Sequence, residues 1–171
     1  MGRKIASQRG LNIHFEVADV CDLEKEGGQY DLIIDSYCLQ CIVFDHERQQ
    51  VFSAVKSRLK SDGYYLVSTA ILDKVHEKMI GSDTLEASDT GTVYTKYGSS
   101  IIDVDTGIVL SPINKSAHDY PDAICIAEQW YLPSRRHLRS SELESELAVA
   151  GFNIVFRDEQ HTGSLAFTLS N

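Results

Sequence analysis

The stretch IHFEVADVCDLEKEGGQYDLIIDSYCLQCI, from Ile13 to Ile42, decides the fold that we predict for this chain. Its first apolar run, Ile13 to Val17, alternates apolar and polar residues and predicts a strand that leads to Asp19. Its second run, Tyr30 to Ile34, is almost continuously apolar, which indicates a strand buried on both faces of a parallel sheet and followed by Asp35. Ligands of open α/β sheets bind beyond the carboxyl ends of the strands. We therefore expect both aspartates to face one small molecule.

A helix and a third strand follow this stretch. Val51, Phe52, Val55 and Leu59 recur at helical spacing after Asp45, which is a suitable N-cap. Asp62 and Gly63 end this helix, and residues 64–69 predict the next strand. The order strand, loop, strand, helix, strand is typical of an α/β sheet.

The pattern changes after Ala70. Residues 71–80 predict a short helix, and residues 81–139 form an irregular insertion. Two short apolar runs, Ile101 to Val104 and Ile108 to Leu110, flank an Asp-Thr-Gly turn and predict a β-hairpin. The insertion also carries several aromatic residues. They either contact a substrate or fill the small core of the insertion.

The last part of the chain returns to regular structure. Ser140 or Ser141 is expected to cap a helix that ends at Gly151. Residues 152–156 and 164–169 predict two strands, and their short connection requires them to be antiparallel. We therefore predict an α/β fold, built as a single domain over residues 1–171, with a mostly parallel sheet, a C-terminal antiparallel hairpin and a β-rich insertion.

Charge and hydropathy exclude several classes of partner. The 171 residues carry a formal net charge of -9, and the isoelectric point is about 5.0. Nucleic-acid backbones need a contiguous cationic surface, so we expect no nucleic-acid partner. No apolar run is long enough to cross a bilayer, and no N-terminal signal is evident, so we expect a cytoplasmic protein without a membrane partner.

The four cysteines show no disulfide framework. Cys38 and Cys41 form a Cys-x-x-Cys motif, but a structural zinc site usually needs a second pair of ligands. Only the isolated Cys21 and Cys125 remain. We therefore predict no metal site and interpret the thiols as packing residues.

The order of these elements resembles the class I methyltransferases that use S-adenosylmethionine. The resemblance rests on ADV-x-DL at Ala18 to Leu23, YDLIIDSYCLQCI at Tyr30 to Ile42, LKSDG at Leu59 to Gly63 and YYLVST at Tyr64 to Thr69, with the C-terminal helix and hairpin. It covers nearly the whole chain and implies a Rossmann-like methyltransferase sheet. The insertion at 81–139 would then be the variable substrate region.

The resemblance also implies residues that bind S-adenosylmethionine. The acid after the family's third strand accepts from the adenine amino group, and its neighbour supplies a backbone contact; the matching residues here are Asp19 and Val20. The residues that end the fourth strand lie beside the methionine portion and the sulfonium; the matching residues are Asp35, Ser36, Tyr37, Cys38 and Leu39. Family members often carry two histidines after this leucine, where the present chain has Gln40 and Cys41.

Methyl transfer needs alignment of the nucleophile with the methyl group and, for some acceptors, removal of a proton. His46, His118 and Tyr120 are candidates for the base. Each of them is also readily interpreted as a surface or packing residue.

The resemblance lacks the beginning of the family pattern. No G-x-G turn and no apolar strand precede Ile13, so the chain looks N-terminally truncated and begins partway through the family's second helix. We expect this to leave unpaired edges at two strands. Three explanations remain open. The two strands pair with each other, another chain supplies the missing strands, for instance in a homodimer, or the chain is a fragment.

Two functions remain open. The first is a methyltransferase that acts on a small-molecule acceptor. The second is a catalytically inactive methyltransferase-like domain that binds a protein or anionic partner through the aromatic insertion and residues 135–139. A third function, that of an unrelated nucleotide-binding domain, is weakened because no G-x-x-x-x-G-K loop is present.

Overall fold

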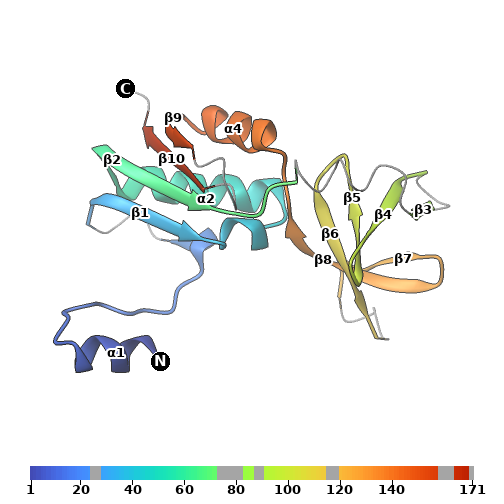
Figure 1. Ribbon diagram of the computed structural model, residues 1–171, viewed down its shortest axis with the longest axis horizontal. Helices are drawn as coiled ribbons and strands as arrows, with labels where there is room; N and C mark the ends of the chain where they lie inside the picture. Colours follow the sequence, from blue (N-terminus) through green and yellow to red (C-terminus); the bar gives the residue numbers. More distant parts are fainter. Residues whose placement is uncertain (24–27, 73–82, 87–90, 115–119, 158–163, 170–171) are drawn as a thin grey trace.

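The computed structural model describes the chain except for residues 24–27, 73–82, 87–90, 115–119, 158–163 and 170–171 (Figure 1). Within these limits the chain forms two separate sheets. One is a four-stranded sheet with two helices packed against it, and the other is a six-stranded sheet formed by the insertion. No helix among the described residues is long and apolar enough to cross a membrane.

The first sheet, which we call the main sheet, has the strand order β1-β2-β10-β9. Its strands are β1 (Tyr30–Ser36), β2 (Leu59–Ser68), β10 (Ser164–Leu169) and β9 (Phe152–Arg157). β1 and β2 are parallel, whereas β10 runs antiparallel to both β2 and β9. The predicted C-terminal antiparallel hairpin is confirmed, and β10 lies between β2 and β9.

Two helices, α2 (Asp45–Arg58) and α4 (Ser140–Val149), pack against one face of the main sheet. The apolar stripe of α2, Val51, Phe52 and Val55, joins Leu143 and Leu147 of α4 in the same core cluster. β2 contributes Tyr65 and Val67 to this cluster, which are 1% and 0% exposed. Burial of these apolar stripes fixes the helices to the sheet.

The opposite face of β1 is open. Leu32 and Ile34 are 51% and 60% exposed, and Tyr64, which pairs with Leu32 across the sheet, is 49% exposed. Only Ile33, on the other face, packs against the main core. The prediction that this strand is buried on both faces is therefore wrong for the described residues, because helices cover only one side of it.

The N-terminal segment does not join the main sheet. Helix α1 (Gly2–Gln8) is followed by an extended chain that runs below β1 in Figure 1. A hydrogen bond from Arg3 Nη2 to the carbonyl oxygen of Phe15, 2.7 Å long, ties this chain to α1. The predicted strand from Ile13 to Val17 is wrong: the backbone is extended, but it has no strand partner among the described residues, and Val17 is fully exposed.

The insertion forms the second sheet, with the order β3-β4-β5-β6-β8-β7. Its strands are β3 (Thr84–Glu86), β4 (Val93–Tyr97), β5 (Ser100–Asp103), β6 (Ile108–Ile113), β7 (Ile124–Ile126) and β8 (Gln129–Arg136). The predicted hairpin is confirmed as β5 and β6, which pair antiparallel around the turn at Gly107. Gly107 has a φ of 72°, which suits glycine in such a turn.

The prediction of a mostly parallel sheet is wrong for the chain as a whole. β1 and β2 form the one parallel strand pair among the described strands, and every strand pair in the insertion is antiparallel. The reason is that the insertion returns by short turns, which impose antiparallel pairing. The helix predicted at 71–80 lies almost entirely outside the described residues.

The insertion lies beyond the ends toward which β1 and β2 run (Figure 1). The Leu72 N–H donates to the carbonyl oxygen of Leu138 at 3.0 Å, which joins the segment after β2 to the segment after β8. Arg136 at the end of β8 donates to the carbonyl oxygen of Val43 and forms an ion pair with Asp45. These contacts hold the insertion against the carboxyl edge of the main sheet.

Candidate functional site

The loop after β1 is organised by the carboxylate of Asp35, which is 8% exposed. Its Oδ1 accepts a hydrogen bond from Cys38 N at 2.8 Å, and both oxygens accept from Leu39 N at 3.2 and 3.1 Å. The Tyr65 hydroxyl donates to Oδ2 at 3.4 Å. Burial raises the pKa of Asp35 above its usual 3.8, although these hydrogen bonds and Arg48 act to lower it. Asp35 therefore shapes the loop through its carboxylate and presents little free surface.

Tyr37 holds an unusual backbone conformation in this loop. Its φ is 63°, a region that residues other than glycine rarely adopt, and its N–H donates to the carbonyl oxygen of Ser68 at 2.8 Å. Its side chain is 40% exposed. Strained backbone of this kind is typical of functional loops and persists where neighbouring contacts enforce it.

Arg48 enforces the conformation from the other side. Its side chain is 2% exposed, and Nη1 donates to the carbonyl oxygens of Leu39 and Ile42 at 2.8 and 3.0 Å. Its Nε and Nη2 each lie 2.6 Å from one carboxylate oxygen of Glu146 on α4. Such a bidentate pair fixes the guanidinium in one orientation. Arg48 thus ties the loop after β1 to both helices.

Sequence reasoning missed Arg48, although a signal was present. Arg48 precedes Val51, Phe52 and Val55 by three, four and seven positions and therefore lies on the apolar face of α2. Glu146 follows the buried Leu143 by three positions and therefore lies on the same side of α4. A cation and an anion at core-facing positions of two helices predict a buried ion pair.

The second loop of the site contains Asp19, Val20 and Cys21. Asp19 is exposed, and its Oδ1 accepts from Cys21 N at 2.9 Å, which caps the short helix η1 (Val20–Asp22). η1 packs on α2, and both Val20 and Cys21 contact the main core. The Cys21 thiol also donates to the Asp19 carboxylate, which helps to raise the pKa of that thiol.

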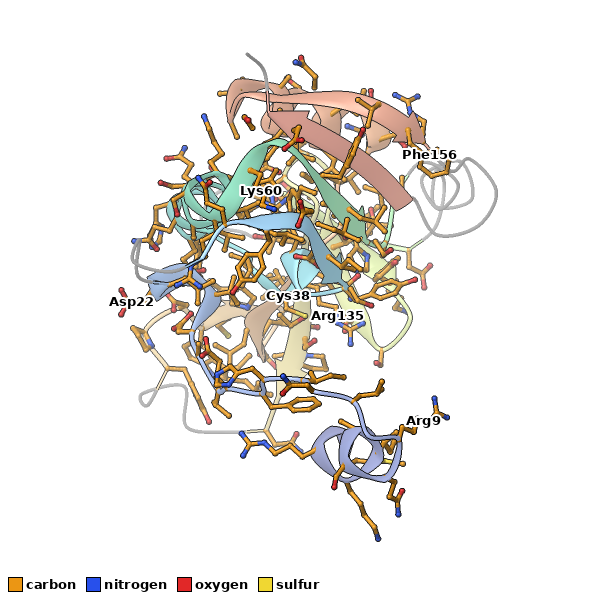
Figure 2. All side chains as sticks on the ribbon, turned by 90° about the vertical axis from the view of Figure 1, so that its left-hand side faces the viewer. Arg9, Asp22, Cys38, Lys60, Arg135 and Phe156 are labelled. Carbon is orange, nitrogen blue, oxygen red and sulfur yellow. The ribbon has the colours of Figure 1, made fainter. Side chains whose placement is uncertain are left out.

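The two loops lie close together. Burial raises the pKa of the Cys21 thiol above its usual 9.0, and the negative charges of Asp19 and Glu47 raise it further, with a smaller effect from Cys38. Val20 and Cys21 of η1 also pack against the core cluster to which Leu39 of the loop after β1 belongs. In Figure 2, Cys38 lies under the end of β1, on the side toward the N-terminal segment. The structure thus brings the predicted residues 19–20 and 35–39 to one edge of the main sheet.

The predicted residues differ in what they expose. Ser36 and Tyr37 are exposed and Cys38 is half-buried. The side chain of Leu39, by contrast, is 1% exposed and lies in the main core. Leu39 can therefore offer only backbone to a ligand, and its N–H is already bound by Asp35.

Two of the three predicted bases, His46 and Tyr120, lie in parts of the chain that the structure describes. His46 is exposed in the first turn of α2, where its ring stacks on Phe44 with centroids 6.0 Å apart. Tyr120 is 50% exposed in the insertion. His118 lies outside the described residues. His137, which sequence reasoning did not single out, is 5% exposed and lies after β8 at the junction of the two sheets.

Gln40 also takes part in this junction. It is 9% exposed, and its Oε1 accepts from Ala70 N, just after β2, at 3.2 Å. This hydrogen bond ties the loop after β1 to the segment after β2. Among the described residues, no group of three or more His, Cys, Asp or Glu side chains could hold a metal ion.

Residues 19–20 and 36–38 form one side of the candidate site, and their chemistry fits S-adenosylmethionine. The exposed carboxylate of Asp19 has further lone pairs that can accept from an amino group, as the adenine end requires. The exposed Ser36 and Tyr37 and the half-buried Cys38 would border the methionine end. The open edge of β1 marks the side of the site that the described residues do not cover.

Comparison with known proteins agrees with this geometry. Residues 1–63 match the family model described as a methyltransferase domain. No curated protein matches the sequence. The solved structures that resemble the chain have low sequence identity to it, so their likeness shows a shared fold.

Three of these structures illustrate the extent of the likeness. An S-adenosylmethionine-dependent methyltransferase from Clostridium acetobutylicum ATCC 824 superposes with a TM-score of 0.59 at 14% identity, over 99% of the present chain and 70% of its own. For the CcbJ methyltransferase from Streptomyces caelestis, the TM-score is 0.58 at 14% identity, over 91% and 63% of the two chains. The 1,6-didemethyltoxoflavin-N1-methyltransferase from Burkholderia thailandensis, solved with 1,6-didemethyltoxoflavin and S-adenosylhomocysteine, gives 0.53 at 13% identity, over 99% and 56%.

Residues 1–63 thus match a model of a methyltransferase domain, and the chain as a whole shares its fold with solved S-adenosylmethionine-dependent methyltransferases.

Proposed function

We propose that this protein transfers a methyl group from S-adenosylmethionine to a small-molecule acceptor. The observation that carries the proposal is that two loops, residues 19–21 and 35–39, pack on one core cluster beside the parallel pair β1 and β2. Ligands of α/β sheets bind at this edge. One of the similar structures was solved with 1,6-didemethyltoxoflavin, which supports a small molecule as the acceptor.

Each loop has a separate role in this proposal. Asp19 accepts from the adenine amino group, and the backbone of Val20 contacts the ring. Ser36, Tyr37 and Cys38 border the methionine portion, while Asp35 and the backbone of Leu39 keep the loop in its strained conformation. The cofactor supplies a methyl group on a sulfonium, which is already a good leaving group. The protein mainly aligns the acceptor with that methyl group.

We also propose that residues 81–139 bind the acceptor. The insertion packs against the carboxyl edge of the main sheet through Leu72, Leu138 and Arg136. This places its sheet next to the two loops. Tyr94 and Tyr131 are 8% exposed and belong to the core of the insertion, so they support its fold and leave acceptor contacts to other side chains.

A homodimer through the edge of β1 is a further part of the proposal. The outer edge of β1 has no strand neighbour among the described residues, and Leu32 and Ile34 are exposed beside it. Pairing of two such edges would satisfy their backbone groups and cover the apolar side chains. In sedimentation velocity, Ile34→Lys should weaken the dimer at least tenfold, whereas Val93→Lys, at an exposed site of the insertion, should not. A monomeric wild-type chain at micromolar concentration would contradict this part.

Calorimetric titration with S-adenosylhomocysteine tests the cofactor site. Asp19→Asn keeps an oxygen that can cap η1 but places an N–H₂ group where the adenine amine must be accepted. We expect this variant to bind at least tenfold more weakly than the wild type. The control is Asp22→Asn, at an exposed neighbour in η1. Equal affinity of wild type and Asp19→Asn would refute the assignment of Asp19, and absence of binding to the wild type would favour a catalytically inactive binding domain.

A further inference from the structure

Half-buried Tyr97 and buried His137 form a pair that no part of the cofactor site uses. Tyr97 ends β4, and His137 directly follows β8. The Tyr97 hydroxyl lies 3.0 Å from His137 Nδ1, and the rings meet edge to face with centroids 5.5 Å apart. β5 and β6 separate these two strands in the sheet, so the contact requires the sheet to curl.

The pair lies where the insertion meets the carboxyl edge of the main sheet. The His137 N–H donates to the carbonyl oxygen of Gly107 at 2.8 Å, and the next residue, Leu138, accepts from Leu72 N. Leu72 comes four residues after Ser68, where β2 ends. A group on this side of the insertion is therefore well placed to act on an acceptor that lies against the cofactor loops.

His137 Nε2 is buried and has no hydrogen-bond partner among the residues that the structure describes. A buried polar atom without a partner costs about 1–3 kcal/mol, so such atoms call for a functional explanation. Buried N–H groups without partners are rarer than acceptors without partners. The arrangement with the proton on Nδ1, which donates to the Tyr97 hydroxyl, therefore fits best, because it leaves a lone pair on Nε2.

The surroundings keep this imidazole neutral. Burial lowers the pKa of His137 below its usual 6.5, and the positive charge of Arg135 lowers it further. A neutral ring with a free lone pair and a fixed second nitrogen has the features of a general base, in which a third group orients the base.

Arg135 adds a second recognition element. It lies two positions before His137, so both side chains leave the same face of the extended backbone. The side chain of Arg135 is exposed and forms no hydrogen bond or ion pair with another described residue, unlike the side chains of Arg136 and Arg139. Its positive charge also acts on Tyr97, whose pKa burial raises and Arg135 lowers.

We propose that His137 Nε2 accepts the proton of the methyl acceptor, that Tyr97 positions the ring, and that Arg135 binds an anionic group of that acceptor. The acceptor would be a small acid that carries an O–H or N–H nucleophile. Its lone pair forms the bond to the methyl carbon while the carbon–sulfur bond breaks, and the electrons of that bond go to sulfur. The acceptor's proton goes to Nε2, and the resulting imidazolium releases it to water. This inference rests on the proposed function for its chemistry.

The first test is the protonation pattern of His137 in the full chain without cofactor. Long-range ¹H–¹⁵N spectra at pH 7.5 should show a neutral ring with a bare Nε2 and a protonated Nδ1. Tyr97→Phe should shift the tautomer population toward the Nε2–H form, whereas Tyr120→Phe, at an exposed tyrosine, should leave it unchanged. A ring protonated on Nε2 in the wild type would overturn the proposal.

The second test adds probes of the proposed chemistry. The three isomers of hydroxybenzoate carry a carboxylate and an O–H group, and benzoate is the matched probe without the O–H. At least one isomer should move the Nε2 resonance several times further than benzoate, and Arg135→Gln should weaken its binding about tenfold. If no isomer exceeds benzoate, the assignment of His137 is overturned. Both tests omit the cofactor, so failed binding of S-adenosylhomocysteine would refute the proposed function separately.

Discussion

The two sheets of this molecule differ in how their strands are covered. In the insertion, neighbouring residues of one strand, Ile101 and Ile102, are 3% and 0% exposed, so both faces of β5 are packed. In the main sheet, β1 packs through Ile33 on one face, while Leu32 and Ile34 stay open on the other. The antiparallel insertion is thus closed by its own residues. The parallel pair β1 and β2 depends on cover from elsewhere, as parallel sheets generally do.

The largest expected effect follows from loss of the ion pair between Arg48 and Glu146, which joins the two helices and the loop after β1. Arg48→Met leaves Glu146 without its partner and frees two loop carbonyls. We expect a loss of roughly 3 kcal/mol in the free energy of unfolding, measured with urea. Lys96→Met, which breaks an exposed pair with Asp83 in the insertion, is the control and should leave the urea midpoint unchanged. Equal effects of the two changes would contradict a special role for Arg48.

The next effect compares two isoleucines from the two sheets. Ile102→Ala removes a side chain that is 0% exposed, and we expect it to cost about 3 kcal/mol because a cavity remains. Ile34→Ala removes a side chain that is 60% exposed in the single chain, and at protein concentrations too low for a dimer it should change the free energy of unfolding by less than about 0.5 kcal/mol. A large loss at such concentrations would mean that Ile34 is covered within the single chain.

Substitution of two glycines with similar backbone angles, Gly107 and Gly98, distinguishes the cost of backbone strain from the cost of a steric clash. At Gly107, with φ 72°, a Cβ would lie 2.3 Å from the carbonyl oxygen of His137. Gly98, with φ 65°, has nothing within 4 Å of that position. Gly107→Ala should cost about 3 kcal/mol and Gly98→Ala about 1 kcal/mol in thermal unfolding, because only the first adds a clash to the backbone strain. Similar losses would show that the turn can move away from His137.

The smallest expected effect is a pH dependence of the free energy of unfolding, which His137 in the insertion causes. The pKa of His137 is lowered in the folded state, so the unfolded chain binds a proton first as the pH falls. Neutral His137 makes its full contribution to the free energy of unfolding above about pH 6.5. This contribution is lost as the pH falls through the pKa that His137 has in the folded state. His137→Gln should flatten this part of the stability curve, and His46→Gln, at an exposed site, should not. An unchanged curve in His137→Gln would contradict the burial of the ring.

The sequence predicted the local elements well and their environment poorly. Alternation and turn residues sufficed for β5 and β6, and helical spacing sufficed for α2, because these signals depend only on near neighbours in the chain. The ends of α2 and β2 were displaced: the helix ends at Arg58, and Leu59 already begins β2. Strand pairing was harder. The alternating run at Ile13 to Val17 has the composition of a strand, but a strand also requires a partner, which periodicity does not report.

The candidate site was predicted in part for the same reason. Asp19 and Asp35 follow apolar runs, and residues next to them, Val20 and Leu39, pack on one core cluster. The engagement of Asp35 with Cys38 and Leu39 depends on how the chain turns after β1, and no sequence pattern gives that turn. The contact of Tyr97 with His137 joins residues 40 positions apart across a curled sheet. Residue spacing carries no information about such a contact.

The central claim is that the two loops at the edge of the main sheet form one cofactor site. Amide ¹H–¹⁵N spectra of the full chain during titration with S-adenosylhomocysteine test it most directly. The largest shifts should fall on Val20, Cys21 and residues 36–39, with smaller changes along the insertion strands. Shifts confined to the insertion or to the groove between α2 and α4 that Gln49, Lys56 and Val149 line, or no shifts at millimolar ligand, would contradict the claim.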